Sequence, residues 1–367
     1  MLADIIRKHA MKNAFDFGRA NPGSIAGKVI GEFPDAKLDM KGTMALISAA
    51  AAEANKMQKS ELESELKKYA FVEKKVEEKR LSLPNAIDGK VITRFPPEPS
   101  GYPHIGHAKA AFLDSECAKE YSGKMILRFD DTNPEKESVE YVDALRAGLQ
   151  WLGISWASES YTSDSIPEIY ECAEKAIAKG AAYVCTCPQK EISANRESGK
   201  PCACRGLPIE EAMAHWKKMH SVYKPGEAIV RFKGDLSALN TVMRDPSLFR
   251  IIEGAHYRQG KKYRVWPTYD FAAPIMDSSE GITHAMRTKE YELRDEVYFK
   301  LIDVVELRKP ELVELSRRSI KNAPISKRLL TPLVKEGKVM GWDDPRLPTL
   351  KGLARRGILP EAIKIFV

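Results

Sequence analysis

Apolar positions in this chain follow two different spacings, and the change from one to the other divides it in two. Residues 1–85 repeat apolar side chains every three or four positions, which predicts helices, with a break at residues 21–23. From residue 90 onward, runs that alternate apolar with polar positions take turns with helical stretches. This alternation predicts an α/β fold with a doubly wound parallel sheet of the Rossmann type, preceded by a helical N-terminal extension. Ligands bind such sheets at the carboxyl ends of the strands.

The clearest strands and helices can be placed on the sequence. Strands are expected at residues 90–95 and 124–130, and a helix is expected over residues 167–179. Another helix is expected after residue 133, with Asn133 as its cap and Pro134 in its first helical position. The apolar stripe predicted for that helix comprises Val139, Val142, Leu145, Leu149 and Leu152.

Two segments far apart in the sequence are interpreted as halves of one nucleotide site. The first reads PHIGHAKA from Pro103, and the second reads PISKR at residues 324–328. A helix that begins near His104 presents unpaired N–H groups and a positive dipole end to a phosphate, and Gly106 lets the phosphate come close. For the first segment taken alone, the alternative is a chance string whose histidines only cap a helix.

Longer motifs around these segments resemble the glutamyl/glutaminyl branch of class I aminoacyl-tRNA synthetases. They read TRFPPEPSG from Thr93, RFDDTNP from Arg128 and GWDDPR from Gly341. The resemblance covers residues 90–367, and the preceding segment resembles, more weakly, the helical extension of archaeal members. It implies glutamate–tRNA ligase activity, in which ATP and Mg²⁺ convert L-glutamate into glutamyl-adenylate and the glutamyl group passes to the 2′-OH of the terminal adenosine of tRNA. Members of this branch usually need bound tRNA even for the first step.

The resemblance also implies a domain organisation. The expected parts are a helical N-terminal extension at 1–88, the first half of a Rossmann catalytic domain at 89–180, an inserted acceptor-stem-binding domain at 181–265, the second half of the catalytic domain at 266–325, and the SKR loop with the start of a stem-contact helical domain at 326–367. The β-barrel anticodon domains typical of the branch do not follow, so a truncated chain is expected. The role of the extension is left open between RNA contact and docking of a protein partner.

The matching positions imply an amino-acid pocket. Arg94, Asp131 and Tyr269 are expected to bind the substrate, because these residue types suit a carboxylate, an ammonium group and an apolar wall. A structural ion pair is the alternative for Arg94 and Asp131. Arg287 stands where glutamyl enzymes carry arginine and many glutaminyl enzymes carry cysteine, so it is expected to hold the γ-carboxylate. A surface arginine or a phosphate contact is the alternative for Arg287.

The resemblance implies catalytic roles for His104, His107 and Lys327, which would offset charge on the leaving pyrophosphate. The expected ATP-binding residues are Pro99, Ser100, Gly101, His104, Gly106, His107, Lys109, Thr288, Arg317, Arg318, Ser326, Lys327 and Arg328. The chain departs from the family at Arg318, where leucine is usual, and at the first two positions of the KMSKS-type loop. The lysine of that loop, Lys327, is retained.

Four of the six cysteines predict a metal site. They form two CxC pairs, Cys185 with Cys187 and Cys202 with Cys204, which can supply four thiolates to a structural zinc ion. Disulfides or unligated buried thiols are the alternatives. Some glutamyl-tRNA synthetases carry zinc in the corresponding insert, which favours the metal.

Composition limits the class of protein without deciding its function. The 367 residues are 43% hydrophobic and 30% charged, the balance of a globular protein, and no apolar stretch is long enough to span a bilayer. The N-terminus has no signal-peptide core, so a cytoplasmic location is expected. A net charge of +7 suits a polyanionic partner such as tRNA, and an ordinary basic surface would look the same.

Three other functions stay open. A glutaminyl-tRNA synthetase would share nearly every motif, and only Arg287 argues against it. A glutamyl-queuosine-type tRNA synthetase normally lacks the N-terminal helices and departs from the GWDDPR region. A non-catalytic RNA-binding paralogue would tolerate loss of the ATP motifs, which are present here. The expected tRNA partners are glutamate isoacceptors, with glutamine isoacceptors left open.

Overall fold

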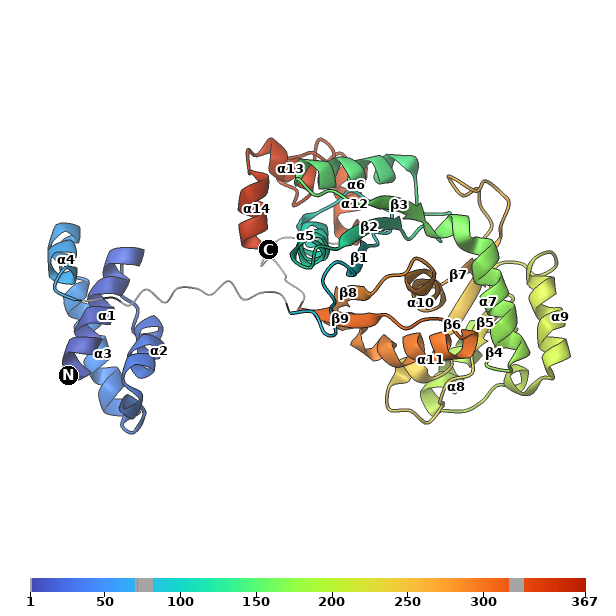
Figure 1. The fold of residues 1–367 in the computed structure, drawn as a ribbon, viewed down its shortest axis with the longest axis horizontal. Coiled ribbons are helices and arrows are strands. Elements are labelled where there is room, and N and C mark those ends of the chain that lie inside the picture. Colours follow the sequence, from blue (N-terminus) through green and yellow to red (C-terminus); the bar gives the residue numbers. More distant parts are fainter. Residues whose placement is uncertain (1, 70, 72–81, 317–326) are drawn as a thin grey trace. The chain divides into compact units, whose positions relative to one another are not determined.

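The computed structural model describes residues 2–69, 71, 82–316 and 327–367, without the side chains of Lys327 and Arg328. It divides into two compact units, Met1–Arg80 and Leu81–Val367 (Figure 1). In the described part of the chain, the first unit holds only helices and the second holds every strand.

The N-terminal unit packs its helices around an apolar core of its own. The described α-helices are α1 Leu2–Phe17, α2 Pro22–Glu32, α3 Met40–Ala54 and α4 Lys59–Leu66. The predicted break at residues 21–23 is the start of α2, where the Asn21 side chain accepts a hydrogen bond of 2.9 Å from the Gly23 N–H. The predicted helical extension is therefore confirmed as a structure.

Parallel strands form the centre of the second unit. They are β1 Ile92–Phe95, β2 Lys124–Phe129, β3 Ser158–Tyr161, β8 His284–Thr288 and β9 Glu311–Leu315. β1, β2 and β3 pair in that order, and β8 pairs with β9. The two groups adjoin where the Thr283 N–H donates to the Ile92 carbonyl oxygen at 2.9 Å. The predicted parallel sheet is confirmed.

Helices cover both faces of these strands (Figure 1). They are α5 Ile105–Glu120, α6 Val139–Trp151, α7 Ile166–Ala178, α10 Tyr269–Ser279 and α11 Asp295–Val305. Successive side chains of β2 point to opposite faces, so Leu127 packs with α5 and α6 while Ile126 packs with Ile282 and Ala285. On the second face, α10 and α11 pack against Leu312 of β9.

The expected start of α6 is wrong. The helix begins at Val139 after Ser138, whose hydroxyl accepts from the Tyr141 N–H, and Val139 is 56% exposed rather than part of the apolar stripe. Asn133 instead opens a turn, in which its N–H donates to the Glu137 carboxylate at 2.9 Å.

The inserted segment is built on an antiparallel sheet. Its strands, in the order β4-β5-β6-β7, are β4 Ala182–Cys185, β5 Ile229–Phe232, β6 Ser247–Ile251 and β7 Val265–Pro267. Helices α8 Gln189–Ser198 and α9 Ile209–Met219 lie between β4 and β5 in the chain. One apolar cluster joins this sheet to α7, α10 and α11, which fixes the insert against the catalytic sheet.

The last described segment returns to the catalytic sheet. It contains α12 Lys327–Lys335, α13 Leu350–Arg355 and α14 Pro360–Phe366. Leu350 and Leu353 of α13 pack into the cluster beneath α5 and α6. Among the helices that the structure describes, none combines the length and apolar character that a membrane crossing requires.

Candidate functional site

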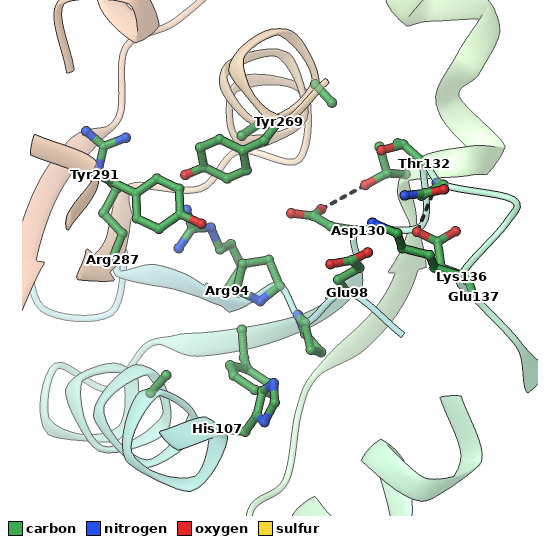
Figure 2. A pocket seen from close by; sticks show the side chains of 18 of the residues that line it. Arg94, Glu98, His107, Asp130, Thr132, Lys136, Glu137, Tyr269, Arg287 and Tyr291 are labelled. Atoms are coloured by element: carbon green, nitrogen blue, oxygen red, sulfur yellow. Dashed lines mark hydrogen bonds between the residues drawn. The ribbon is translucent and has the colours of Figure 1, made fainter. Parts of the chain in front are cut away.

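Two cavities open at the carboxyl ends of the parallel strands. The strand-end cavity, about 790 Å³, lies between β1, β2, β8, α10 and the insert (Figure 2). The helix-end cavity, about 810 Å³, lies at the start of α5 and against β8 and β9. Their common lining comprises His107, Ala110, Asp114, Met286, Arg287, Thr288 and Tyr291. Ligands in the two cavities would therefore touch the same wall.

The start of α5 shapes the helix-end cavity. His104 is the N-cap, and its Nδ1 accepts from the Gly106 N–H at 3.1 Å, while the His107 Nδ1 accepts from the His104 N–H at 3.1 Å. Both Nδ1 atoms are acceptors, so the neutral rings carry their protons on Nε2. Burial lowers the pKa of His107 well below its usual value, and the neighbouring His104 lowers it further. Both imidazoles can thus donate through Nε2.

Gly106 is required by the folded-back position of the His104 ring. A Cβ atom at Gly106 would lie 2.9 Å from Cε1 of His104, closer than such atoms approach. Lys109, one turn further along α5, donates from Nζ to the carbonyl oxygen of Ser316, and Thr288 lines both cavities. The structure thus brings these predicted residues together at one end of α5.

Other predicted ATP-binding residues are placed differently. Pro99, Ser100 and Gly101 line neither cavity and form the loop ahead of α5. Arg317, Arg318 and Ser326 lie outside the described residues. For Lys327 and Arg328 the structure describes only the backbone at the start of α12.

Arg94 lines the strand-end cavity from β1 and is 1% exposed. Its Nε and Nη2 donate to the two carboxylate oxygens of Asp277 at 3.0 and 3.1 Å, and its Nη1 donates to the Met286 carbonyl oxygen at 2.6 Å. These bonds use three of the five guanidinium N–H groups. Burial opposes the ionisation of Asp277, yet the charges of Arg94 and Arg128 lower its pKa to about 2. Arg94 is therefore held by a structural ion pair in the wall of the cavity, with two guanidinium N–H groups left over.

Asp131, expected to bind the substrate, is fully buried and is not among the residues that line the strand-end cavity. Its carboxylate accepts hydrogen bonds of 2.8 Å from the N–H and hydroxyl of Ser163 and from the hydroxyl of Tyr257. The cavity is lined instead by Asp130. Asp130 Oδ1 accepts from Arg128 and Thr162, each at 2.9 Å, which orients the carboxylate. Figure 2 labels Asp130 in the cavity.

Tyr269 lies in the wall of the strand-end cavity, as expected, at the start of α10. Its ring packs against that of Tyr291, with 4.8 Å between the centroids. Tyr291 lines both the strand-end and the helix-end cavities. This tilted aromatic pair lies beside the arginines of the site.

Arg287 also lines both cavities and is buried. It forms an ion pair with Asp295, its Nε lies 3.9 Å from Glu314 Oε1, and its guanidinium lies 5.3 Å from the centroid of the Tyr298 ring. Apart from that ion pair, which joins Nη2 to Asp295, its Nε and Nη1 have no hydrogen-bond partner among the described residues. The charge of Arg287 is thus balanced, while the N–H groups of Nε and Nη1 are not used by a described residue.

Asp114 was not among the predicted residues, although it lines both cavities. It lies seven residues after His107 on α5, a spacing that places both on one helix face. Its side chain is 2% exposed, and Oδ1 has no hydrogen-bond partner among the described residues. Burial raises the pKa of Asp114 well above its usual value, because it disfavours the charged form of the carboxyl group.

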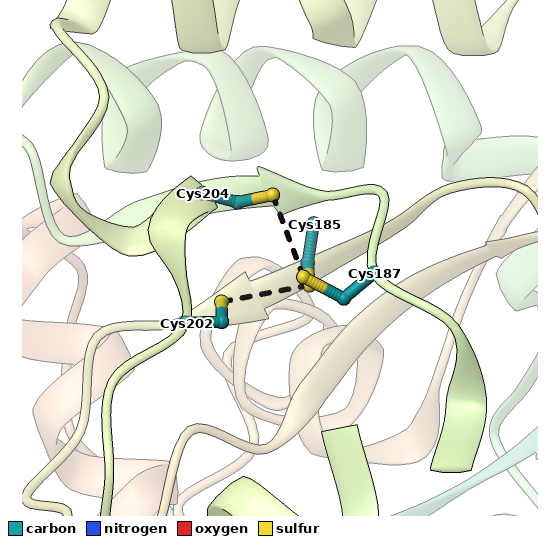
Figure 3. Close-up of side chains that lie close together, drawn as sticks. All are labelled: Cys185, Cys187, Cys202 and Cys204. Carbon is teal, nitrogen blue, oxygen red and sulfur yellow. Dashed lines mark hydrogen bonds between the residues drawn. The ribbon is translucent and has the colours of Figure 1, made fainter. Parts of the chain in front are cut away.

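The four cysteines of the two CxC pairs converge in the insert, at the end of β4 and the start of a short helix at Ala203–Gly206 (Figure 3). All four sulfur atoms lie within 4.8 Å of one another. The Sγ atoms of Cys185 and Cys202 are 3.8 Å apart, and so are those of Cys187 and Cys204. Four thiolates at ~2.3 Å around a tetrahedral zinc ion stand ~3.8 Å apart.

Polar groups surround these sulfur atoms. The hydroxyl of Tyr183 lies 3.8 Å and Nη1 of Arg231 lies 4.0 Å from the Cys202 sulfur, and the Thr186 hydroxyl lies 3.6 Å from that of Cys204. Arg231 is buried, and a cation there offsets the negative charge of four thiolates around one divalent ion. The donor set and its surroundings fit zinc.

Comparisons with known proteins agree with this arrangement. The family model described as tRNA synthetases class I (E and Q), catalytic domain, matches residues 90–367. A glutamate–tRNA ligase of Nitrosopumilus maritimus is 49% identical, across 99% of this chain and 65% of its own length. One of Pyrococcus furiosus is 41% identical, across 97% of this chain and 65% of its own. The chain thus spans just under two thirds of the length of these curated relatives.

A solved structure shares the fold. The crystal structure of a glutamate tRNA ligase from Elizabethkingia meningosepticum matches with a TM-score of 0.50 and 24% identity, over 65% of this chain and 52% of that one. At this identity the likeness concerns the fold alone.

Proposed function

The chain belongs to the class I tRNA synthetases of the glutamyl and glutaminyl (E and Q) group, and from this premise we propose that it is a glutamate–tRNA ligase. The observation that carries the proposal is the wall common to the two cavities, where the His107 imidazole and the Arg287 guanidinium face adjoining spaces. A nucleotide at the helix end and a glutamate at the strand ends would meet along this wall. The 49% identical ligase of Nitrosopumilus maritimus supports glutamate and tRNA as substrates.

In the first step, an α-carboxylate oxygen of glutamate forms a bond to the α-phosphorus of ATP, and pyrophosphate leaves with the electron pair of the broken P–O bond. The Nε2–H groups of His104 and His107 donate to phosphate oxygens, and the positive end of the α5 dipole favours the negative charge of the phosphates. By the family resemblance, Lys327 adds a positive charge. Mg²⁺, held largely by the phosphates, supplies further positive charge when it is bound.

In the second step, the 2′-oxygen of the terminal adenosine of tRNA bonds to the activated carbonyl carbon. AMP leaves with the electron pair of the C–O bond, and the hydroxyl proton is released. The protein's part in both steps is to position and to stabilise charge, and no side chain acts as a nucleophile. The proposal includes a cytoplasmic location and glutamate isoacceptors of tRNA as the substrates.

Within the pocket, we assign the substrate ammonium group to Asp130 rather than Asp131. Asp130 Oδ1 is occupied by Arg128 and Thr162, whereas no described donor bonds Oδ2. Arg94 offers its remaining N–H groups to a substrate carboxylate, and Arg287 offers to the γ-carboxylate the N–H groups that its ion pair with Asp295 does not use. A neutral glutamine amide would leave part of the Arg287 fork unpaired.

Glutamine is the second candidate substrate, because Arg287 forms an ion pair with Asp295. Asp295 already balances the charge of Arg287, and Glu314 lies nearby, so a neutral amide would meet a wall with little net charge.

The insert would also hold one structural zinc ion at Cys185, Cys187, Cys202 and Cys204, which ties the end of β4 to the segment that follows α8.

The deciding experiment is tRNA-dependent exchange of pyrophosphate into ATP, driven by glutamate or by glutamine. We expect exchange with glutamate in the unmodified chain, and a loss of preference for glutamate in Arg287→Cys. Exchange driven by glutamine alone would move the assignment to the glutaminyl enzyme. The assay must contain tRNA, because members of this branch usually need it for adenylate formation.

A further inference from the structure

One buried carboxyl group in the site has no partner in the described part of the chain. Asp114 lies on α5, is 2% exposed and lines both the strand-end and the helix-end cavities. No hydrogen bond or ion pair joins its carboxyl group to a described residue, and its Oδ1 is withdrawn from solvent. Such a group lowers stability unless a ligand or an ordered water satisfies it.

The backbone fixes where this carboxyl group lies. The Thr93 hydroxyl donates to the Asp114 carbonyl oxygen at 2.8 Å, which anchors this turn of α5 on β1. Thr93 is fully buried and directly precedes Arg94, the arginine proposed to bind a substrate carboxylate. Asp114 is therefore held beside the strand that carries Arg94.

Arg94 and Asp114 interact at a distance. The charge of Arg94 lowers the pKa of Asp114, against the larger effect of burial, but the two side chains form no ion pair. Arg94 instead donates to Asp277 and to the Met286 carbonyl oxygen, which leaves two of its N–H groups unused. Both Arg94 and Asp114 line the strand-end cavity, so one ligand in that cavity can contact both.

The ligand that suits these two groups is a substrate carboxylate. Its charge and shape match the unused N–H groups of Arg94. An ionised Asp114 would repel it, whereas the neutral acid donates an O–H to it. Burial and the negative charge of Asp277 both disfavour the ionised form of Asp114 and raise its pKa. The phosphates of ATP are the rival anion, but Arg94 does not line the helix-end cavity.

We propose that Asp114 is a neutral hydrogen-bond donor, whose O–H group binds one carboxylate of the substrate glutamate together with the unused N–H groups of Arg94. This inference rests on the proposed function, because it places glutamate in the strand-end cavity. The carboxylate is then held from α5 and from β1 at once, which fixes its orientation. Asp114 contacts the substrate and keeps its proton.

The test is calorimetric titration of the full chain with glutamate at mildly acidic pH, without ATP or tRNA. Asp114→Asn keeps a donor in its amide group, so its affinity should stay within about twofold of the unmodified chain. Asp114→Leu has a similar size but no donor, so it should bind glutamate about tenfold more weakly or worse. The control Glu116→Gln removes a carboxylate from the same helix, outside both cavities, and should leave the affinity unchanged.

Two results overturn the proposal. Unchanged glutamate binding in Asp114→Leu would mean that an ordered water satisfies the carboxyl group and that the substrate does not contact it. Equal weakening in Asp114→Asn and Asp114→Leu would mean that the site needs a negative charge at this position. If Asp114→Leu does not fold, as judged by circular dichroism, the proton measurement on Asp114→Asn decides instead.

That second measurement follows the proton of Asp114. Glutamate binds the protonated form, so its affinity is complete below the pKa of Asp114 in the free protein and falls as the pH rises through that pKa. Binding at alkaline pH then takes up a proton, which is read by repeating the titration in buffers of different ionisation enthalpy. The uptake should exceed that of Asp114→Asn by up to about one proton. Equal uptake at every pH at which both chains stay folded overturns the proposal.

The groups around Asp114 do not imitate this difference. They are Arg94 on β1, His107 on α5, Tyr269 and Asp277 on α10, Arg287 on β8 and Tyr291 in the turn at Lys289–Arg294. The pKa of Asp277 is lowered to about 2 and that of Tyr269 is raised to about 12, and arginines do not titrate near neutral pH. Burial lowers the pKa of His107 and raises that of Tyr291. Glu137, whose pKa is raised to about 8, lines the strand-end cavity in both chains, so its effect cancels in the comparison.

Glutamate binding requires no adenylate, so the two proposals fail separately. Pyrophosphate exchange is measured in parallel, in the presence of tRNA. Absent exchange in a chain whose variants bind glutamate as expected counts against the ligase function alone. Glutamate-driven exchange with the same KM for glutamate in Asp114→Leu and in the unmodified chain counts against the role of Asp114 alone.

Discussion

Replacing Asp295 by asparagine should make the protein bind glutamate more tightly. Asp295 pairs with Arg287, the arginine proposed to hold the γ-carboxylate, so the substrate must compete with it for the same guanidinium. The Asp295 side chain is 31% exposed, so solvent screens the pair, and its removal should change the free energy of glutamate binding by about 1 kcal/mol. At 25 °C this is about fivefold in affinity.

The stability cost of that change should be small. Asp295 is the first residue of α11, where a negative charge interacts favourably with the helix dipole, and its loss costs about 0.3–1 kcal/mol. Asp303→Asn is a matched control, because it removes the same charge from the same helix at an exposed site paired with Lys309. It should leave glutamate binding unchanged.

The measurement is the KM for glutamate and for glutamine in tRNA-dependent pyrophosphate exchange. For Asp295→Asn we expect a fall of about fivefold in the KM for glutamate, and no fall for glutamine, which brings no charge to Arg287. A higher KM for glutamate would refute the reasoning. It would mean that Asp295 orients Arg287 for the substrate and does not compete with it.

Three further predictions concern stability, metal and nucleotide. Burial raises the pKa of Glu137 to about 8, so the native protein holds this proton more tightly than the unfolded chain does. The resulting contribution to stability is complete below about pH 4.5 and is lost as the pH rises through 8. In thermal melts across this range, the melting temperature should therefore fall less for Glu137→Gln than for the unmodified chain. Purified protein should contain about one zinc ion per chain by elemental analysis. Cys204→Ser should lower the zinc content, and the control Cys172→Ser should not. Equal zinc content in the two variants would exclude the four-cysteine site. Gly106→Ala should raise the KM for ATP about tenfold, because the added methyl displaces the His104 ring. Gly27→Ala is the control, since its added methyl meets nothing within 4 Å, and it should leave the KM for ATP unchanged. An unchanged KM for ATP in Gly106→Ala would contradict the role of the ring.

The sequence predicted the parts of the site that local pattern determines. The alternation of strands and helices placed β1, α5 and β2 within a few residues of their observed bounds, because the spacing of apolar positions within each segment determines its type. The start of α5 could be predicted for the same reason, since Gly106 and the two histidines satisfy the first turn within four residues.

Contacts with residues distant in the sequence determine which side chains face the cavity, and the sequence pattern does not predict those contacts. Asp130 and Asp131 are adjacent, and which of them faces the cavity depends on Ser163 and Tyr257, both far along the chain. Asp131 turns away because those two residues bind it. No spacing within the motif carries that information.

The same limit applies to residues brought in by tertiary packing. Tyr291 lies in a 3-10 turn at Lys289–Arg294, and Arg250 lies on a strand of the insert, where neither follows a recognisable motif. Their importance comes from where the insert rests against α10, and the shared apolar core fixes that position. Only the folded arrangement shows that both reach the cavities.

The wall that two cavities hold in common constrains how this protein could evolve a new amino-acid preference. Substitutions at Arg287 or Thr288 would change contacts with the nucleotide as well as with the amino acid, so a gain in binding a new amino acid would come with weaker ATP binding. Glu98 and Asp130 line the strand-end cavity but not the helix-end cavity. Asp130 is proposed to bind the ammonium group that every amino acid carries, so selection for a different substrate would find its least pleiotropic route at Glu98, with changes in the common wall arising later and together with compensating mutations.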